Sequence, residues 1–232
     1  MINNSVENFS INQRFSFLED LTSMVVNGIT PSLVVTGPGG NGKTSTVTKV
    51  VTSILDSDQY ISFKGYSTAR GLYNTLYDNN GKLIIFDDCD SVLEDKVSLN
   101  ILKSALDSYD KRTISWMSKM NKNDVYPSQF DFTGRIIFIS NKEGKSIDGA
   151  IRSRSLMVDL TMTSIEKIDR LRFLINDILP EYTLEVKEDS LEFLDSIKDT
   201  YDINIRTFIM VSKMRSMFVD TWRSLAMYMV SQ

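Results

Sequence analysis

The stretch TGPGGNGKTS, residues 36–45, restricts the possible folds of this chain more than any other segment. It lies between a short apolar run, SLVVT, and a run of helical periodicity, KTSTVTKVVTSIL. Gly37, Gly42, Lys43 and Thr44 match the pattern G-x-x-x-x-G-K-[ST] at every position. In that pattern the glycines let backbone N–H groups turn around a phosphate, the lysine reaches its oxygens, and the hydroxyl can ligate Mg²⁺. The segment therefore predicts a strand, a phosphate-binding loop and a helix in succession.

The composition excludes several kinds of site. The 232 residues include no histidine, which excludes histidine-based acid–base catalysis and histidine-ligated metals. The single cysteine, Cys89, excludes an intramolecular disulfide and fits a reducing compartment. The N-terminus lacks an apolar signal core and no apolar run could span a membrane, so we expect a cytoplasmic protein, including the cytoplasm of a phage-infected host cell. The net charge of −4 argues against broad coating of nucleic acid but leaves a local basic stripe open.

Short apolar runs alternate with helical segments along most of the chain. The expected strands are residues 32–36, 60–65, 82–86, 135–140 and 155–160. Fully apolar runs are typical of central parallel strands, and their alternation with helices predicts a right-handed α/β sheet. Residues 112–134 are expected to form a strand and an irregular excursion. The predicted fold class is α/β, a P-loop NTPase with a parallel five-stranded sheet.

The pattern changes to amphipathic helices after Leu160. Thr163 and Glu166 form a capping box that opens a helix running to Pro180. The segments DSLEFLDSIKD and NIRTFIMVSKMRSMFVD continue the helical pattern. We therefore expect an N-terminal segment and helix over residues 1–30, an α/β nucleotide-binding core over 31–160, and a small all-helical lid domain over 161–232.

Polar residues end two of the predicted strands. Asp87 and Asp88 follow KLIIF, and Asn141 follows RIIFIS. Because ligands gather at the carboxyl ends of parallel strands, these side chains should lie beside the glycine loop. One carboxylate can hold the Mg²⁺ shell, a second can polarise water, and a neutral amide can position that water. The alternative is a solvent-facing strand end at which Asp90 caps the helix that begins at Ser91.

Three arginines are candidates for charge stabilisation. Arg152 and Arg154 precede the last predicted strand, and one of them could reach the γ-phosphate held by a neighbouring subunit. Arg206, in the helical region, could close over the nucleotide of its own chain. Plain surface charge is the alternative for all three.

The order of these parts resembles that of the AAA+ ATPases from about residue 14 onward. GPGGNGKT looks like Walker A, LIIFDD like Walker B, Asn141 like sensor 1, Arg154 like the arginine finger and Arg206 like sensor 2. The resemblance implies ATP and Mg²⁺ as cofactors, and a homo-oligomeric ring or spiral, a hexamer for example. The nucleotide-binding loop would comprise Gly37, Pro38, Gly39, Gly40, Asn41, Gly42, Lys43, Thr44 and Ser45, with Thr44 and Asp87 toward the metal.

One position departs from the family pattern. The second Walker B acid is usually Glu, whereas this chain has Asp88, one methylene shorter. Bacterial replication initiators resemble this variant. The segment FDFTGRIIFISN is similar to small AAA+ proteins of phages and plasmids that are concerned with DNA replication.

The substrate is less constrained than the nucleotide. Lys64 and Tyr66, and Lys119 and Lys122 beside Trp116 and Tyr126, could bind single-stranded DNA by phosphate pairing and base stacking. The aromatic residues could instead grip a polypeptide or pack against their own domain. An ATP-driven DNA-acting ring in replication (helicase, helicase loader or accessory) is the preferred hypothesis. A nucleotide-controlled protein remodeller or assembly switch is the alternative, and a P-loop kinase is a third, disfavoured by Asn141.

Overall fold

The structure is a computed structural model that describes residues 9–107, 109, 111–116 and 125–232. Its residues cluster into two compact units. The sheet unit consists of Ser16–Gly37 and Lys43–Leu160. The helical unit consists of the described residues up to Phe15, Pro38–Gly42 and Thr161–Gln232. The chain thus passes between the units within the glycine loop as well as near residue 160. The expected domain boundaries at residues 30 and 160 remain a prediction about independent folding.

The sheet unit is built on five parallel strands in the order β2-β3-β6-β1-β7. The strands are β1 Ser32–Thr36, β2 Tyr60–Lys64, β3 Leu83–Asp87, β6 Arg135–Ile139 and β7 Leu156–Asp159. All five expected strands are present, and the predicted fold class is confirmed. Since β1 and β3 both pair with neighbours on each side, their residues are buried throughout, as the apolar runs predicted.

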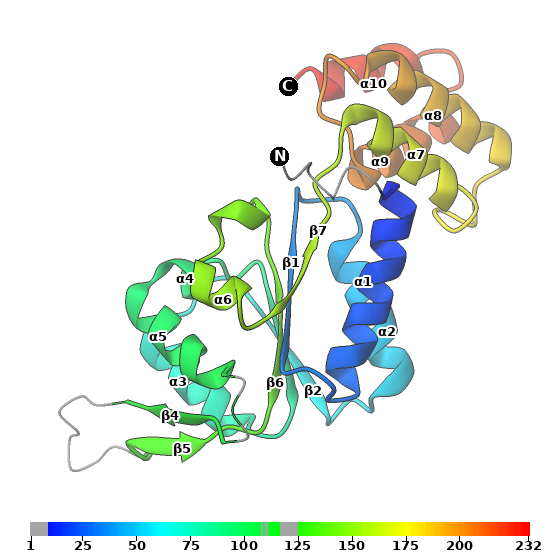
Figure 1. Cartoon of the computed structure of the whole chain (residues 1–232). Coiled ribbons are helices and arrows are strands. Elements are labelled where there is room, and N and C mark those ends of the chain that lie inside the picture. The colour runs from blue at the N-terminus through cyan, green and yellow to red at the C-terminus, as the bar shows by residue number, and fades with distance from the viewer. Residues whose placement is uncertain (1–8, 108, 110, 117–124) are drawn as a thin grey trace. The chain divides into compact units, whose positions relative to one another are not determined.

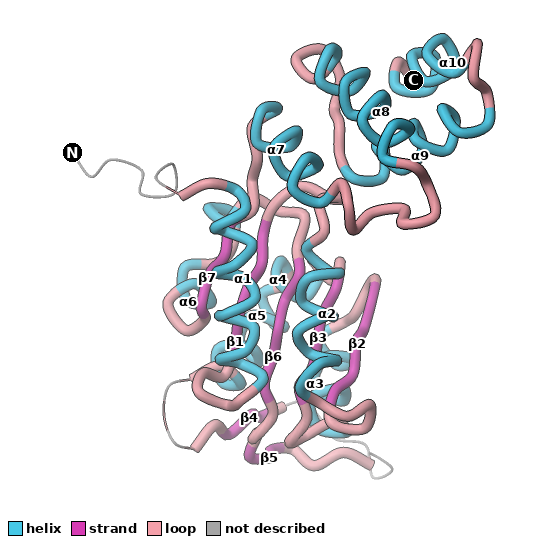
Figure 2. Tube along the Cα trace, turned by 90° about the vertical axis from the view of Figure 1, so that its right-hand side faces the viewer, coloured by secondary structure: helices cyan, strands magenta, loops and turns pink. Residues whose placement is uncertain are grey.

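Helices cover both faces of this sheet (Figures 1 and 2). In the sheet unit they are the larger part of α1 Ile11–Val26, α2 Lys43–Ile54, α3 Ala69–Asp78, α4 Ser91–Glu94, α5 Lys96–Ala105 and α6 Gly149–Arg152. Alternate residues of each strand face opposite sides, so Val34, Ile84 and Phe138 join the core beneath α3 to α6. The helices α1 and α2 lie against the other face (Figure 1).

A short antiparallel pair precedes β6 and was only partly expected. It comprises β4 Thr113–Ser115 and β5 Gln129–Asp131. Trp116 packs against Tyr73, with ring centroids 5.9 Å apart, and Tyr126 packs edge-on against Tyr77 at 5.7 Å. These two aromatic residues therefore contribute to the core of the sheet unit, as the packing alternative predicted.

The helical unit holds the remaining helices, α7 Ser164–Leu174, α8 Leu184–Ile197, α9 Ile205–Met217 and α10 Trp222–Val230. The predicted capping box is confirmed, because Thr163 and Glu166 bond each other's backbone N–H reciprocally. The predicted extension of α7 to Pro180 is wrong. The helix ends at Leu174, whose carbonyl accepts from Asp177 and Ile178, and the Asn-Asp pair that follows favours turns.

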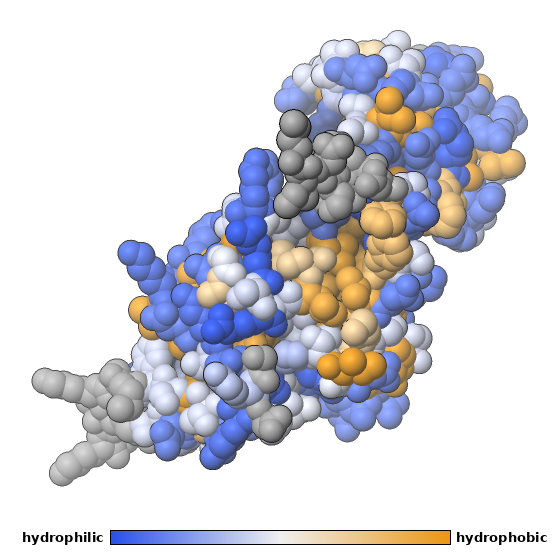
Figure 3. Space-filling model, viewed as in Figure 1, coloured by the Kyte–Doolittle hydropathy of each residue, from blue (hydrophilic) through white to orange (hydrophobic). Residues whose placement is uncertain are grey.

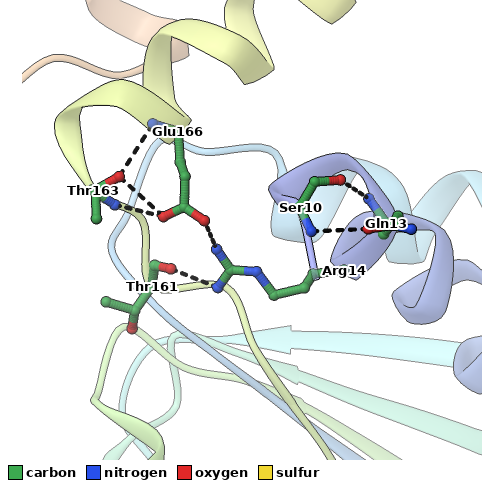
Figure 4. Close-up of polar contacts among 6 residues, drawn as sticks. All are labelled: Ser10, Gln13, Arg14, Thr161, Thr163 and Glu166. Atoms are coloured by element: carbon green, nitrogen blue, oxygen red, sulfur yellow. Dashed lines mark hydrogen bonds and ion pairs between the residues drawn. The ribbon is translucent and has the colours of Figure 1, made fainter. Parts of the chain in front are cut away.

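Helix α1 begins at Ile11, within the N-terminal segment that was expected to contain a helix. Ser10 explains this, since its hydroxyl accepts from the N–H of Gln13 and the Gln13 side chain accepts from the Ser10 N–H, at 3.3 and 2.9 Å (Figure 4). This reciprocal pair is a Ser-x-x-Gln capping box. It satisfies two backbone donors that would otherwise have no partner at the start of the helix.

Arg14 links the start of α1 to the start of α7 inside the helical unit (Figure 4). Its guanidinium donates to the Thr161 carbonyl oxygen at 2.7 Å and forms a short ion pair with Glu166. Only 8% of the Arg14 side chain is exposed. Glu166 therefore contacts both helices, because its other oxygen accepts from the Thr163 N–H.

Within the ranges that the structure describes, no helix is both long and apolar enough to cross a membrane.

Replacing Arg14 should destabilise the helical unit. We expect Arg14→Met to lower its free energy of unfolding by about 2 to 4 kcal/mol, because Glu166 and the Thr161 carbonyl lose a partly buried charged donor. The fluorescence of Trp222 during urea unfolding, in a Trp116→Phe background, measures this. Arg172→Met is the matched control, since Arg172 is 58% exposed and its ion pairs should contribute less than about 1 kcal/mol. Equal losses in both variants would contradict the assigned role of Arg14.

Candidate nucleotide and metal site

The glycine loop has the backbone that its sequence predicts. Gly37, Gly40 and Gly42 have φ of 127°, 79° and 93°, in the region that L-residues avoid. A Cβ on Gly40 would also lie 2.9 Å from the Asn204 side chain. Helix α2 starts at Lys43, directly after the loop, so its first N–H groups are available to an anion.

Lys43 is buried at the amino end of α2. Its ammonium donates to the Gly37 carbonyl at 2.6 Å and to Asn141 Oδ1 at 3.0 Å, and the residue is 5% exposed. The lysine therefore connects the carboxyl end of β1 with the carboxyl end of β6. This is the position from which a lysine can reach phosphate oxygens at the mouth of the loop.

Thr44 and Asp87 form the second contact of the site. The Thr44 hydroxyl donates to Asp87 Oδ1 at 2.9 Å, which joins the start of α2 to the end of β3. Asp87 is 2% exposed, and its Oδ2 receives no hydrogen bond among the described residues. The Lys64 ammonium lies 2.8 Å from that Oδ2, a charge contact without hydrogen-bond geometry.

Asp88 has a left-handed backbone, with φ of 55°. Asp is one of the few residues besides glycine that adopt this region readily. The Asp88 N–H donates to the Ile139 carbonyl at 3.0 Å, and Asn141 Nδ2 donates to Asp88 Oδ1 at 2.7 Å. The amide of Asn141 therefore touches both Lys43 and Asp88, and the structure brings together the five predicted residues at three strand ends.

Ser140 and Asp90 support this edge and were not identified as partners from the sequence. The buried Ser140 hydroxyl donates to Asp90 Oδ1 at 2.6 Å and accepts from the Lys142 N–H at 3.1 Å. The Lys142 carbonyl in turn accepts from the Gly37 N–H at 3.1 Å. Asp90 stands at the N-cap position of α4 but makes no side-chain capping bond, so the cap that belonged to the alternative interpretation is not formed. Its carboxylate is instead used by Ser140.

In the helical unit, Arg206 stands in the first turn of α9. The preceding residue, Ile205, donates its N–H to the Gly40 carbonyl at 3.1 Å. Asn204 caps the helix by accepting from the Thr207 N–H at 3.1 Å. The start of α9 is thus bonded to the middle of the glycine loop, and Arg206 is one residue from that bond and exposed. No sequence pattern signalled the contact between Asn204 and Gly40.

Arg154 lies at the amino ends of the strands, whereas Lys43 lies at their carboxyl ends. Its carbonyl accepts from the hydroxyl of Ser32, the first residue of β1, at 3.3 Å. The loop follows the other end of β1, roughly 13 Å away at the ~3.3 Å rise per residue of a strand. The Arg154 guanidinium donates to the Ala150 carbonyl at 3.2 Å, whereas Arg152 is exposed. The structure therefore does not bring Arg152 or Arg154 close to Lys43 at the carboxyl ends of the strands of the same chain.

The residues predicted for nucleic acid have different surroundings. Lys64 pairs with Asp87, and Tyr66, which is 82% exposed, follows it after one glycine. Lys119 and Lys122 lie outside the described residues. The Lys64–Asp87 contact could not be read from the sequence, because it requires knowing that β2 pairs with β3 in the register Lys64 opposite Asp87.

Burial raises the pKa of the Cys89 thiol to about 11, and the charges of Asp87, Asp88 and Asp90 contribute in the same direction. Cys89 is 4% exposed and its sulfur lies 3.4 Å from the Phe63 carbonyl oxygen. A thiol with such a pKa is protonated at neutral pH and is a poor nucleophile. The single cysteine is thus a structural part of the β3 edge rather than a reactive group.

The donors at this edge suit a magnesium ion bound with a nucleotide. Mg²⁺ binds to proteins through one or two carboxylates together with hydroxyl, water and phosphate oxygens. Thr44, Asp87 and Asp88 supply that set, and the buried Asp87 Oδ2 without a hydrogen bond is a suitable ligand atom. In the part of the chain that the structure describes, no group of three His, Cys, Asp or Glu side chains could hold a metal by itself.

Comparisons with known proteins bear on the fold of the chain. No protein-family model matches the chain. A 36.7 kDa protein from the nrdC-mobD intergenic region of Enterobacteria phage T4, described as uncharacterized, is 30% identical over 174 residues. The match covers 68% of this chain and 53% of the phage protein, so the chain spans about half the length of that relative.

Solved structures of RuvB from Thermotoga maritima, the Holliday junction branch migration motor, are similar to this chain in fold. One has a TM-score of 0.56 at 15% identity and is matched over 94% of this chain and 68% of its own. A mutant of the same protein gives 0.56 at 15% identity, with 97% and 71% covered. The chain therefore shares the fold of these RuvB structures. Since fold alone does not fix activity, the function of the site is argued separately below.

The Cys89 thiol should resist alkylation at neutral pH. We expect iodoacetamide to modify it slowly in the folded protein, with a rate that increases as the pH approaches about 11. Because the folded pKa is raised, the proton stabilises the folded state fully below the pKa of the unfolded chain, and this stabilisation is lost as the pH rises through about 11. Mass spectrometry of folded and urea-unfolded protein measures the two rates. Comparable rates at neutral pH would contradict the assigned burial.

Proposed function

We propose that this protein is a Mg²⁺-dependent ATPase that hydrolyses ATP between the subunits of a ring or spiral. The observation that carries the proposal is the set of contacts among Lys43, Thr44, Asp87, Asp88 and Asn141 at the carboxyl ends of β1, β3 and β6. Phosphoryl transfer requires positioning and charge neutralisation rather than covalent chemistry, and this edge supplies both signs of charge in one place.

Each residue then has a distinct role. The loop from Gly37 to Ser45 binds the phosphates, and Lys43 reaches the β- and γ-oxygens. Thr44 and Asp87 hold Mg²⁺, which when bound neutralises charge on the phosphates. Asp88 accepts a proton from, or orients, the attacking water. Asn141, which touches both Lys43 and Asp88, positions that water relative to the γ-phosphate.

The arginines complete the site from two directions. Arg206 acts on the nucleotide of its own chain, supported by the bond between Ile205 and the Gly40 carbonyl. Arg154, or its neighbour Arg152, acts on the nucleotide of an adjacent subunit. This proposal is supported by the position of Arg154 beside Ser32, at the amino ends of the strands. Lys43 of the same chain lies at the carboxyl ends, so Arg154 is far from the nucleotide site of its own chain.

A surface suited to self-association lies near Arg154. In Figure 3, apolar residues gather over the edge strand β7 and helix α1 on the side shown. Of the apolar residues of α1 and the turn that follows it, Phe17 is 40% exposed and Ile29 is 70% exposed. An edge strand with exposed apolar neighbours is suited to burial against another chain. We propose that subunits pair at this surface and that the Arg154 end of β7 faces a second nucleotide site.

DNA in replication is the substrate that we propose, with the polypeptide-directed switch as the alternative. Exposed Tyr66 beside Lys64 supports contact with single-stranded DNA. The internal packing of Trp116 and Tyr126 supports neither hypothesis, because rings packed within their own unit serve neither base stacking nor the gripping of a polypeptide. Turnover measured with and without single-stranded DNA separates the two hypotheses. Stimulation supports a DNA-acting ring, and indifference with retained cooperativity supports a protein-directed switch.

Nucleotide binding should depend on Lys43. We expect Lys43→Ala to weaken binding of ATP by about a hundredfold, because a buried phosphate-directed charge is lost. Lys49→Ala is the matched control, since Lys49 is an exposed lysine on the same helix α2. Equilibrium titration with a fluorescent ATP analogue measures both affinities. Equal affinity for the two variants would refute the phosphate site.

Hydrolysis should require Arg154 from a neighbouring subunit. We expect Arg154→Ala to lower turnover by a factor of about a hundred or more without loss of nucleotide binding. Asp88→Asn should be equally inactive. A mixture of the two variants should regain part of the turnover, because an intact Asp88 in one subunit can then meet an intact Arg154 from the other. Turnover in Arg154→Ala equal to wild type, or a mixture as inactive as its components, would exclude the shared site.

A further inference from the structure

The ion pair between Lys64 and Asp87 places a lysine at the carboxylate that the metal needs. We propose that Lys64 is an internal counter-ion that competes with the divalent cation for Asp87 and thereby sets the metal affinity of the site. This inference rests on the proposed nucleotide site and adds a residue to it whose effect is on metal binding.

The geometry singles out one oxygen of Asp87. Thr44 bonds Oδ1 at 2.9 Å, so the remaining buried atom is Oδ2. Lys64 Nζ is 2.8 Å from Oδ2 but does not make a hydrogen bond of acceptable geometry with it. A charge contact of this kind neutralises a buried carboxylate without using the directed lone pair that a metal would take.

The position of Lys64 follows from the sheet. It is the last residue of β2, an outer strand of the five, and it pairs in register with Asp87, the last residue of β3. The two side chains are therefore neighbours at the carboxyl edge. Asp87 is 2% exposed whereas 67% of the Lys64 side chain is exposed, so the carboxylate is fixed and the ammonium can leave.

The segment after Lys64 permits such a movement. Gly65 has φ of 93°, and a Cβ built on it would meet no atom within 4 Å. The backbone turn directly after Lys64 is therefore not packed against other atoms on the side where a Gly65 side chain would lie. The ammonium can turn outward into solvent while the strand pairing of β2 with β3 is kept.

Electrostatics then makes the two cations exclusive. An ammonium and a divalent cation on the same carboxylate repel each other, and the repulsion is strong where one partner is buried. In the absence of metal, Lys64 compensates a charge that burial would otherwise penalise. When a metal ion arrives with the nucleotide, part of its binding energy is used to displace the lysine. The lysine therefore lowers the affinity for metal and keeps the empty site folded.

The test is metal binding rather than turnover. Electron paramagnetic resonance measures free Mn²⁺ in titrations of protein saturated with a non-hydrolysable ATP analogue. Lys64→Gln should bind Mn²⁺ about three to ten times more tightly than wild type, the range expected for loss of one partly screened charge. Lys49→Gln, an exposed lysine on α2, should leave the affinity unchanged.

Lys64→Arg is the second variant and keeps the charge. A guanidinium binds a carboxylate with two parallel donors, so Arg at this position should hold Asp87 more firmly and weaken Mn²⁺ binding. It also tests the inference should Lys64→Gln fold poorly. Equal Mn²⁺ affinity in wild type and both Lys64 variants would overturn the inference, as would weaker binding in Lys64→Gln.

Failure of the proposed function has a different signature. If the ATP analogue binds to none of the proteins, the nucleotide site itself is refuted together with the inference. If the analogue binds equally with and without Mn²⁺, the proposed metal site is refuted while the phosphate site stands. If the analogue binds with Mn²⁺ but Lys64 has no effect, the site stands and Lys64 is only a surface partner of Asp87.

Discussion

The parallel ladder that joins β3, β6 and β1 is the constraint on which the site depends. Its pairings hold Asp87, Ile139 and Val35 in register at the carboxyl ends of neighbouring strands. Asp87, Asp88 and Asn141 stand on or within two residues of the ends of β3 and β6, and the loop that leads to Lys43 and Thr44 follows β1. The contacts between Lys43 and Asn141 and between Thr44 and Asp87 then connect helix α2 to the strands on the far side of the loop. A shift of one residue in any of these pairings would turn the side chains to the wrong face.

Much of the fold could be predicted because its signals are local. Apolar runs of five residues mark strands that are buried on both faces, and the glycine pattern marks the turn between β1 and α2. The capping box at Thr163 was likewise readable from two residues three apart. The end of α7 was not, since helical periodicity continued beyond Leu174 while the backbone turned at Asn-Asp.

The predicted site residues at the strand ends lie together in the structure, whereas their partners depend on strand order. The sequence does not say that β2 lies beside β3, so the contact of Lys64 with Asp87 had no local signal. The same holds for Ser140, whose hydroxyl reaches Asp90 across 50 residues of chain. Asp90 satisfied the pattern of a helix cap but is used in a tertiary bond. Trp116 and Tyr126 had the composition of a binding surface, yet pack within the sheet unit.

The glycine loop is divided between the two units. Residues Pro38–Gly42 cluster with the helices after Thr161, while Gly37 and Lys43 cluster with the sheet. The bond from Ile205 to the Gly40 carbonyl means that the loop is shaped partly by α9. The absence of a Cβ at Gly40 is required here for contact with Asn204 as well as for its positive φ.

The left-handed backbone of Asp88 gives a reason for the shorter acid at this position. Asp and Asn tolerate positive φ several-fold more often than other residues, because their short polar side chains can bond locally. At φ of 55°, a longer acid would lack this advantage. The Asp88 carboxylate also accepts a hydrogen bond from the amide of Asn141. This bond fixes the position of the carboxylate, although the side chain is one methylene shorter than that of Glu. The identity of the second acid is thus coupled to the main-chain conformation at the end of β3. A substitution of Asp88 by Glu would require a different backbone conformation at this position.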